Sequence, residues 1–434
     1  MEKLSAETGA VLIKKARIID PQSSAHNKVC DILVENGMIS QIGENLSHES
    51  AKSLSAENLH VSPGWMDLRV NFRDPGHEEK EDLQSGIEAA ISGGFTAVGL
   101  SPDTTPTIDS KADIEYIYAR AESYPLDVYP YGAVSQGLKH QELSEMYDMY
   151  QAGAVAFSTG SKALNNYFLA KLAMQYSATW APAHHVFALD KNLIGKGVVH
   201  EGYYSTLLGL KGIPSLAEEV ALHALLNVAA YAEAGLHINA VSSAKTLDII
   251  ASYQKELPIT TDVALANICF TDEVLQGYDA NFKTLPPIRS KTDREALING
   301  IKNGSIQAIT SNHEPHAIED KRCEFDLAAF GIAPMESFFG ALITHTGKEL
   351  SLEEIINCIS INPRAILDLE PVKIEVGEEA NFTFFNPTKK YTLHASEQKS
   401  KAANNPFTGK ELSGKPLGIL NQSTLILTDD SWED

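Results

Sequence analysis

The fold is decided by residues 60–101, which read HVSPGWMDLRVNFRDPGHEEKEDLQSGIEAAISGGFTAVGLS. An apolar run opens this stretch and a helix-length segment near 80–92 follows. Gly93-Gly94 ends that segment before a second apolar run at 96–101. Strand, helix and strand in this order are typical of a β/α unit, in which the two strands lie parallel in one sheet. The stretch therefore predicts a parallel sheet whose strands are connected by helices.

The same alternation continues through the middle of the chain. Further apolar runs, most of them followed directly by a helix-length segment, lie at 128–135, 154–159, 180–188, 236–243, 259–270 and 307–313. Together with the two runs described above they make eight units. Eight β/α units over about 250–300 residues indicate an α/β fold of the (β/α)8 TIM-barrel type, in which functional side chains lie at the carboxyl ends of the strands.

The first part of the chain has a different pattern, with short strand-like runs and no helix-length segment between them. Residues 11–20 and 31–43 contain the alternating apolar positions of strands. Asn36-Gly37 divides the second run, and an Asn-Gly pair is the strongest short-range signal for a tight hairpin turn. This part therefore predicts a small antiparallel β-structure.

The last part of the chain resembles the first. Residues 380–387 and 391–396 have strand-like patterns, and the tail from Lys399 is rich in Gly, Pro and Asn. Two β-segments at opposite ends of a chain can pair in one domain, which brings the termini close together. The expected organisation is a small β-sandwich domain made from both termini around a barrel, with boundaries at 1–60, 61–370 and 371–434.

Composition limits the classes of partner. The formal net charge is −22, and an acidic surface argues against nucleic acid and anionic membranes as main partners. The N-terminus lacks the apolar segment of a secretory signal. No Cys-x-x-Cys pairing is present, so we expect neither a disulfide framework nor a zinc knuckle, and a cytoplasmic location. The four cysteines are Cys30, Cys269, Cys323 and Cys358.

One helix start is predicted from a local motif. Residues 215–218 read Ser-Leu-Ala-Glu before a long apolar segment. In a capping box, the Ser side chain accepts a hydrogen bond from the backbone three residues on, and the Glu side chain reaches back to the first backbone N–H. The motif therefore predicts a helix that begins after Ser215, with Glu218 directed at the cap.

Several long blocks occur in an order that is specific to one family. They are SPGWMDLRVNFRDPGHEEKEDLQSGIEAAISGGFTAVGLSPDTTP (62–106), AGAVAFSTG (152–160), HEGYYSTLLGLKGIPSLAEE (200–219), YDANFKTLPPIRSKTDREAL (278–297), SNHEPH (311–316), AAFGIAPMES (328–337) and INPRAILDL (361–369). On these blocks the chain resembles the dihydroorotases of the amidohydrolase superfamily, in the class related to hydantoinases and allantoinases. The resemblance implies a barrel with an attached β-domain and a role in pyrimidine biosynthesis. It also implies zinc ions that activate water for hydrolysis of a cyclic amide.

The resemblance also locates the metal ligands, and every one of these positions is altered. The family has an H-x-H pair, an acid, two further histidines and a catalytic aspartate, and these positions are here Arg69, Asn71, Thr159, Phe187, Ala240 and Asn312. Arginine has no lone pair to offer. Bringing Arg69 within a few ångströms of a divalent cation would cost several kcal/mol at an effective dielectric of about 20. We therefore expect no metal, no zinc cofactor and no catalytic residue.

Residues around these positions are also changed. The family's T-P-H-H block begins here with Ala264, and its Asn before Pro-Pro is Leu285. Lys162 lies near the acidic position, where some relatives use a carbamylated lysine, but a carbamylated lysine has no purpose without histidines to share the metal. Other metal sites are open in principle but disfavoured. His184 and His185 are adjacent on a strand and should point to opposite faces.

A second metal alternative lies in the block of residues 312–316. His313 and His316 flank a turn there, and a metal between them would need a further ligand such as Glu314. Ordinary rim or core histidines are the simpler interpretation. We therefore treat these histidines as structural.

Three residues could still hold a ligand. Arg73 matches the arginine that binds the substrate carboxylate in the family, Asp103 replaces an asparagine of the same site, and His316 matches a substrate-contacting histidine. An arginine can bind both oxygens of a ligand carboxylate through two parallel N–H groups. The negative charge of Asp103 would repel such a ligand. The favoured interpretation is that Arg69 or Arg73 pairs with Asp103 and fills the old site.

Three functional hypotheses follow from the resemblance. The main one is a non-catalytic dihydroorotase-like protein that acts as a structural or assembly partner. Some bacteria carry such inactive chains, which assemble with aspartate carbamoyltransferase, and we expect a homodimer that recruits this enzyme. The first alternative is an active, metal-dependent dihydroorotase that converts dihydroorotate to carbamoyl aspartate. The second alternative is a metal-free metabolite sensor.

Overall fold

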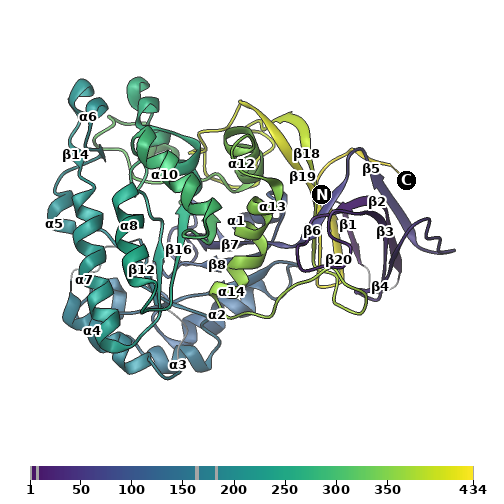
Figure 1. The fold of residues 1–434 in the computed structure, drawn as a ribbon, viewed down its shortest axis with the longest axis horizontal. Helices are drawn as coiled ribbons and strands as arrows, with labels where there is room; N and C mark the ends of the chain where they lie inside the picture. Colours follow the sequence, from purple (N-terminus) through teal and green to yellow (C-terminus); the bar gives the residue numbers. More distant parts are fainter. Residues whose placement is uncertain (1, 6–8, 162–165, 181–183, 434) are drawn as a thin grey trace.

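The computed structural model describes residues 2–5, 9–161, 166–180 and 184–433. A barrel surrounded by helices occupies one end of the molecule, and a β-sheet domain that carries both termini occupies the other (Figure 1). The two parts meet where strand β7 (Trp65–Val70) follows strand β6 (His60–Pro63). The expected α/β barrel with a β-domain from both termini is therefore confirmed, while the exact domain boundaries stay predictions.

Parallel strands form the barrel wall. Within the described residues they are β7 (Trp65–Val70), β8 (Phe95–Leu100), β9 (Asp127–Pro130), β10 (Gly132–Ala133), β11 (Phe157–Ser158), β12 (His184–Phe187), β15 (Leu236–Asn239), β16 (Ile259–Ala264) and β17 (Ala308–Thr310). The strands β9 and β10 come from one predicted run that is interrupted at Tyr131. Neighbouring strands pair in parallel, and a bridge between Val70 and His313 closes the barrel.

Helices cover the outside of the wall. The longer ones in the described part of the chain are α1 (Leu83–Ser92), α2 (Lys111–Ala121), α4 (Tyr167–Ser177), α7 (Leu216–Ala232), α8 (Ala244–Tyr253), α10 (Lys291–Lys302) and α12 (Phe338–Thr346). Helix α1 illustrates the local cause: Asp82 caps it, and Ile87 and Ile91 lie one turn apart on its buried face. Burying one such side chain stabilises the fold by about 1.5–3 kcal/mol.

Shorter elements connect these units. They are α3 (Met146–Gln151), α5 (Lys191–Ile194), β13 (Val199–His200), α6 (Tyr203–Leu208), β14 (Gly212–Ile213), α9 (Leu265–Cys269), α11 (Ile318–Lys321), α13 (Leu352–Ile356) and α14 (Asn362–Ile366). Four of them lie in the insertion between β12 and α7. The insertion forms part of the rim around the strand ends (Figure 1).

Strands from both ends of the chain build the β-domain. They are β1 (Glu2–Ser5), β2 (Ala10–Ile18), β3 (Val29–Glu35), β4 (Met38–Gly43), β5 (Lys52–Ala56), β6 (His60–Pro63), β18 (Phe382–Thr392), β19 (Glu411–Asn421), β20 (Thr424–Leu427) and β21 (Trp432–Glu433). The two halves are joined by antiparallel pairing of β6 with β18. The predicted hairpin joins β3 and β4 through Asn36 and Gly37, which both have positive φ, as such a turn requires.

In the last part of the chain, one prediction was wrong and one strand was missed. Residues 391–396 are not a strand of their own, because β18 continues through Thr392 with a register shift between Asn386 and Lys390. In addition, the sequence analysis did not identify β19, which lies in the tail. The bulge interrupted the alternation of β18, and the Gly and Pro residues of β19 concealed a long strand that pairs on both sides.

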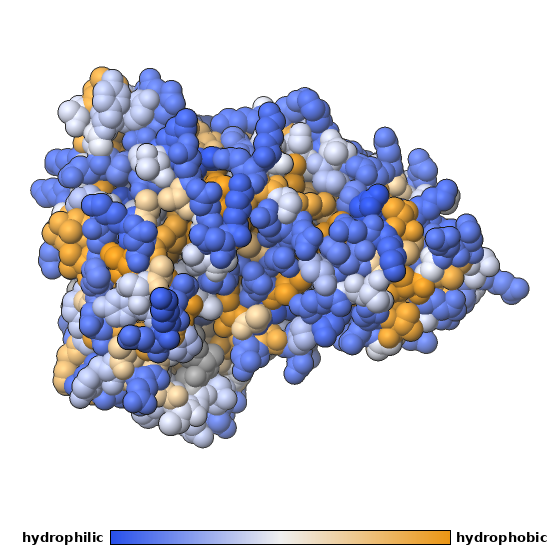
Figure 2. All heavy atoms as spheres, viewed as in Figure 1, coloured by the Kyte–Doolittle hydropathy of each residue, from blue (hydrophilic) through white to orange (hydrophobic). Residues whose placement is uncertain are grey.

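The face of the molecule that Figure 2 shows is largely hydrophilic, with smaller apolar areas between the hydrophilic residues. All four cysteines are free, and three of them are buried. No helix in the described part of the chain is both long and apolar enough to cross a membrane.

Candidate functional site

The carboxyl ends of the barrel strands bring three of the altered positions into contact. Arg69 lies near the end of β7 and is 7% exposed. Its Nη2 donates a hydrogen bond of 2.5 Å to Oδ1 of Asn312. The guanidinium also lies over the ring of Phe187, with Cζ 5.7 Å from the ring centroid. Residues from the first, fifth and eighth barrel strands or the loops after them thus meet around one cation.

The neighbouring positions are neutral or apolar. The hydroxyl of Thr159 accepts a hydrogen bond from the backbone N–H of Phe187 at 3.2 Å. Ala240 belongs to a buried cluster with Phe187 and Ala264, and Leu285 packs against this cluster. Ala240 has a φ of 51°, a conformation that is uncommon for a residue with a side chain. The mouth of the barrel therefore has apolar walls around Arg69.

Asn71 and Arg73 are bound to the protein itself. The side-chain oxygen of Asn71 accepts a hydrogen bond from the backbone N–H of Arg73 at 2.9 Å, and its amide donates to the Asp103 carbonyl at 3.3 Å. Arg73 donates from Nε to the Pro315 carbonyl and from Nη2 to Oε1 of Glu314 at 2.6 Å. Because Glu314 already neutralises Arg73, this arginine has no free fork for a ligand carboxylate.

The expected pairing of an arginine with Asp103 was therefore wrong. The Asp103 carboxylate accepts hydrogen bonds from the hydroxyl of Ser101 at 2.6 Å and from the backbone N–H of Ser161 at 2.9 Å. Burial raises the pKa of Asp103, and the carboxylate of Glu314 raises it further. Asp103 therefore lies beside the loop after β11. Arg73 pairs instead with Glu314, which lies 241 residues away in the chain.

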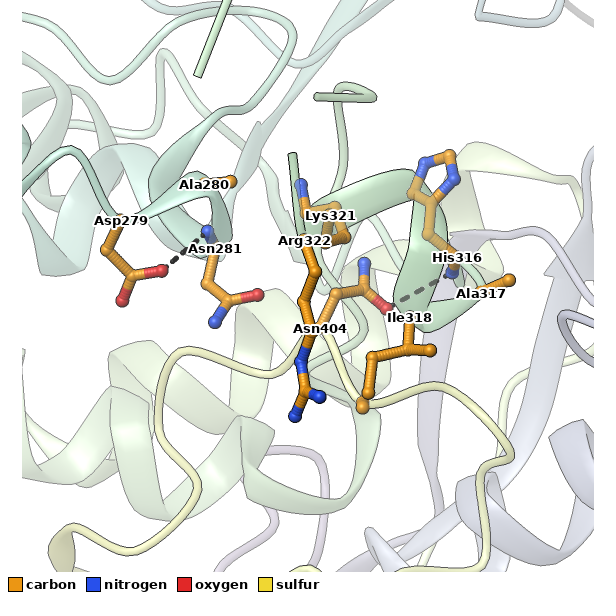
Figure 3. A pocket seen from close by; sticks show the side chains of 10 residues that line it. Asp279, Ala280, Asn281, His316, Ala317, Ile318, Lys321, Arg322 and Asn404 are labelled. Atoms are coloured by element: carbon orange, nitrogen blue, oxygen red, sulfur yellow. Dashed lines mark hydrogen bonds between the residues drawn. The ribbon is translucent and has the colours of Figure 1, made fainter. Parts of the chain in front are cut away.

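His316 faces a pocket separate from Arg69. Its Nε2 lies 2.7 Å from the Phe330 carbonyl and donates to it, and burial lowers the pKa of the ring. Figure 3 shows the pocket, with Lys321 and Arg322 near Asn404, whose side chain accepts the His316 backbone N–H. The pocket has a volume of about 220 Å³, and neither Arg69 nor Arg73 lines it.

His184 and His185 point to opposite faces of β12, as expected. His184 lies 2.6 Å from the hydroxyl of Ser177 on α4, outside the barrel, and burial lowers its pKa to about 4. His185 lies inside the barrel, with its ring centroid 4.4 Å from that of His237 and 5.0 Å from that of Tyr131. The two histidines therefore share no site.

His313 belongs to a different buried group. Its Nε2 lies 3.6 Å from Oε2 of Glu81, and both side chains are fully buried. Glu336 lies close by, and burial raises its pKa to about 6, an effect that backbone hydrogen bonds from Lys399 and Ser400 partly oppose. This group links the loop before α1 to the C-terminal tail, whereas the Glu314 side chain pairs with Arg73 and the His316 ring donates to the Phe330 carbonyl. A metal shared by His313, Glu314 and His316 finds no support in this arrangement.

The donor set does not fit the zinc of the family. A zinc ligand must present a deprotonated sulfur, nitrogen or oxygen atom, and a guanidinium, a phenyl ring and a methyl group present none. In the described ranges, no group of three or more His, Cys, Asp or Glu residues could hold a metal ion. Lys162 lies outside the described residues.

Sequence reasoning missed a buried ion pair beside the mouth. Ser215 makes no side-chain cap, so the predicted capping box was wrong. Glu218 instead accepts hydrogen bonds from Nη2 of Arg289 at 3.0 Å and from the backbone N–H of Ser242 at 2.9 Å. Arg289 also donates from Nε to the Ser242 hydroxyl and lies 3.3 Å from Nδ1 of His200. The Glu-after-Ser spacing could not reveal a partner 71 residues away.

The family profile that matches this chain and its sequence relatives carry the same family name. The family profile described as Dihydro-orotase-like matches residues 59–246. A protein named dihydroorotase from Ruminiclostridium cellulolyticum is 37% identical, with 94% of this chain and 96% of that protein covered. Another, from Acetivibrio thermocellus, is 35% identical, with 96% and 99% covered.

Solved structures extend the same likeness to the fold. The L-hydantoinase from Arthrobacter aurescens has a TM-score of 0.85 at 22% identity, with 96% of each chain covered. A D-hydantoinase structure has a TM-score of 0.81 at 20% identity, with 98% of this chain and 96% of that chain covered. At such identities the likeness concerns the fold alone.

Proposed function

Because this chain belongs to the dihydroorotase family of amidohydrolases, we propose that it is a pyrimidine-pathway protein without metal-dependent catalysis that acts as a structural or assembly partner. The single observation that carries the proposal is the position of Arg69. Its guanidinium contacts Phe187 and Asn312, at two further positions where relatives would hold the metal. A fixed cation there opposes a divalent ion electrostatically.

The loss of the catalytic base supports the same proposal. Hydrolysis of a cyclic amide needs a group that takes a proton from the attacking water, and the family uses an aspartate at the position of Asn312. The asparagine side chain cannot accept that proton near neutral pH. Its oxygen is also occupied by the guanidinium of Arg69. Neither the metal ion nor the general base of the family's reaction is then available.

A second candidate is an ordinary dihydroorotase, and the similarity to known proteins favours it. Relatives that are 35–37% identical over nearly the whole chain carry the name dihydroorotase. For this candidate, a metal would have to bind through residues other than the family's ligands. The two candidates differ in metal content and in turnover, so one preparation separates them.

We expect the purified chain to bind well below one zinc ion per molecule and to show no chelator-sensitive hydrolysis of dihydroorotate. The physical reason is the guanidinium at the metal position. Elemental analysis after incubation with zinc, together with an assay with and without a chelator, measures both quantities. The dihydroorotase from Ruminiclostridium cellulolyticum, prepared identically, serves as the positive control. Stoichiometric zinc with chelator-sensitive turnover would instead support the second candidate.

For the assembly role, we propose a homodimer that binds aspartate carbamoyltransferase, in the cytoplasm. The expected result is a chain that elutes with the mass of two copies, and a larger species when the cognate transferase is added at micromolar concentration. Size-exclusion chromatography with light scattering gives both masses. A mixture whose two components keep their separate masses would rule out this partner.

A further inference from the structure

We propose that the centre around Arg69 binds an anion, namely a small organic carboxylate with a flat, apolar body. The position where relatives hold a metal cation would then hold a carboxylate anion. This inference goes beyond the proposed assembly role and depends on it only in that no metal ion occupies the same centre.

The first observation is that Arg69 is a buried cation without an anion. Three other arginines of the described chain are similarly buried: two of them pair with a carboxylate, and the third, Arg364, has no anion but donates to three oxygen atoms. Arg73 pairs with Glu314, and Arg289 pairs with Glu218. Arg69 has one neutral amide oxygen and one aromatic ring, and it pairs with no carboxylate of the described residues. A buried charge is costly unless an opposite charge accompanies it.

The second observation is that part of the guanidinium remains available. Nε of Arg69 is enclosed and has no hydrogen-bond partner. Nη2 donates to Asn312, whereas Nη1 donates to no described residue and is not among the enclosed atoms. A guanidinium presents its N–H groups as a planar fork, which matches the two oxygens of a carboxylate. The outer edge of Arg69 is therefore the part of the guanidinium that an anion would contact.

The third observation is that the surrounding acids are neutral or engaged. Both positions that are acidic in relatives, Thr159 and Asn312, are uncharged here. Asp103 is held by Ser101 and Ser161. Asp67 accepts the backbone N–H of Arg69 at 2.9 Å, and burial raises its pKa. Repulsion of an incoming anion is thereby reduced.

The fourth observation concerns the walls, which decide the shape of the ligand. Phe187, Ala240 and Ala264 form a buried apolar cluster, with Leu285 packed against it. Phe187 lies under the guanidinium and can stack on a flat group beside it. The side chains of this cluster carry no polar group that could bind a phosphate or a sugar. They suit a carboxylate on a compact planar body.

Benzoate, with its neutral analogue benzamide, is the probe that tests the charge requirement. Calorimetric titration should show benzoate binding at least about tenfold tighter than benzamide, which corresponds to about 1.4 kcal/mol. Arg69→Met should weaken benzoate binding by at least about tenfold as well. Arg322→Met, which removes the same charge from an exposed arginine beside the His316 pocket, should leave benzoate affinity unchanged.

Two results would overturn the proposal. One is equal benzoate affinity in the parent chain and Arg69→Met; the other is no binding of benzoate or acetate to the parent chain at about 10 mM, a concentration that detects even weak sites. Crystals of the parent chain soaked in bromide give a measurement that needs no variant. An anomalous peak beside the Arg69 guanidinium is expected, and its absence, with peaks at other cationic sites, counts against the proposal. Failure here leaves the assembly role intact, whereas zinc-dependent turnover would remove the proposed function itself.

Discussion

Zinc will bind stoichiometrically once the six altered side chains at the barrel mouth are replaced together. Imidazole and carboxylate donors then converge where Arg69, Phe187 and Asn312 now meet. Protein zinc sites bind with roughly 10–16 kcal/mol, so a gain of at least about a thousandfold in affinity is expected over the parent chain. The replacements are Arg69→His, Asn71→His, Thr159→Asp, Phe187→His, Ala240→His and Asn312→Asp.

A matched control isolates the charge at the centre. A variant with the other five replacements that keeps Arg69 should bind zinc far more weakly, because the guanidinium stays among the new ligands. Competition with a chromogenic chelator measures both affinities. If the parent chain takes up zinc as tightly as the sixfold variant, the assignment of these positions as former ligands is wrong.

Arg289→Met should destabilise the protein by about 3–5 kcal/mol, because it leaves Glu218 buried without its partner. Both side chains are nearly inaccessible, with 1% exposure for Arg289 and 4% for Glu218. The pair fixes the start of α7 to the loop after β15 through Ser242. Denaturation in urea measures the change in the free energy of unfolding.

Arg294→Met provides the comparison for this second prediction. Arg294 pairs with Glu349 at 2.6 Å, but Glu349 is 36% exposed, so water can solvate it after the change. Arg294 is itself 15% exposed and also donates to the carbonyls of Ile268 and His345, so its loss should cost more than the about 0–1 kcal/mol of an exposed pair but less than the loss of Arg289. Combining Arg289→Met with Glu218→Gln should restore part of the lost stability, because no unpaired charge then remains. A cost for Arg289→Met that is no larger than that for Arg294→Met would show that burial does not govern this pair.

Much of the fold could be predicted because its causes are local. Apolar runs that alternate with helix-length segments need no knowledge of distant residues, and neither does the hairpin at Asn36-Gly37. The same holds for the identity of the altered positions, since a residue type such as Arg69 is visible in the chain itself. Errors occurred where pairing overrode the local pattern, as in β18 with its bulge and in the Gly- and Pro-containing β19.

The sequence by itself determined the family, the barrel with its β-domain, and the absence of imidazole and carboxylate donors at the former ligand positions. Only the tertiary structure decided which charges meet. Arg73 pairs with Glu314 rather than Asp103, and Glu218 pairs with Arg289 rather than capping its own helix. Arg69 is left with a neutral amide and a ring. The physical reason is that barrel closure sets the distances between side chains hundreds of residues apart, and electrostatic energy depends on those distances and on burial rather than on order along the chain.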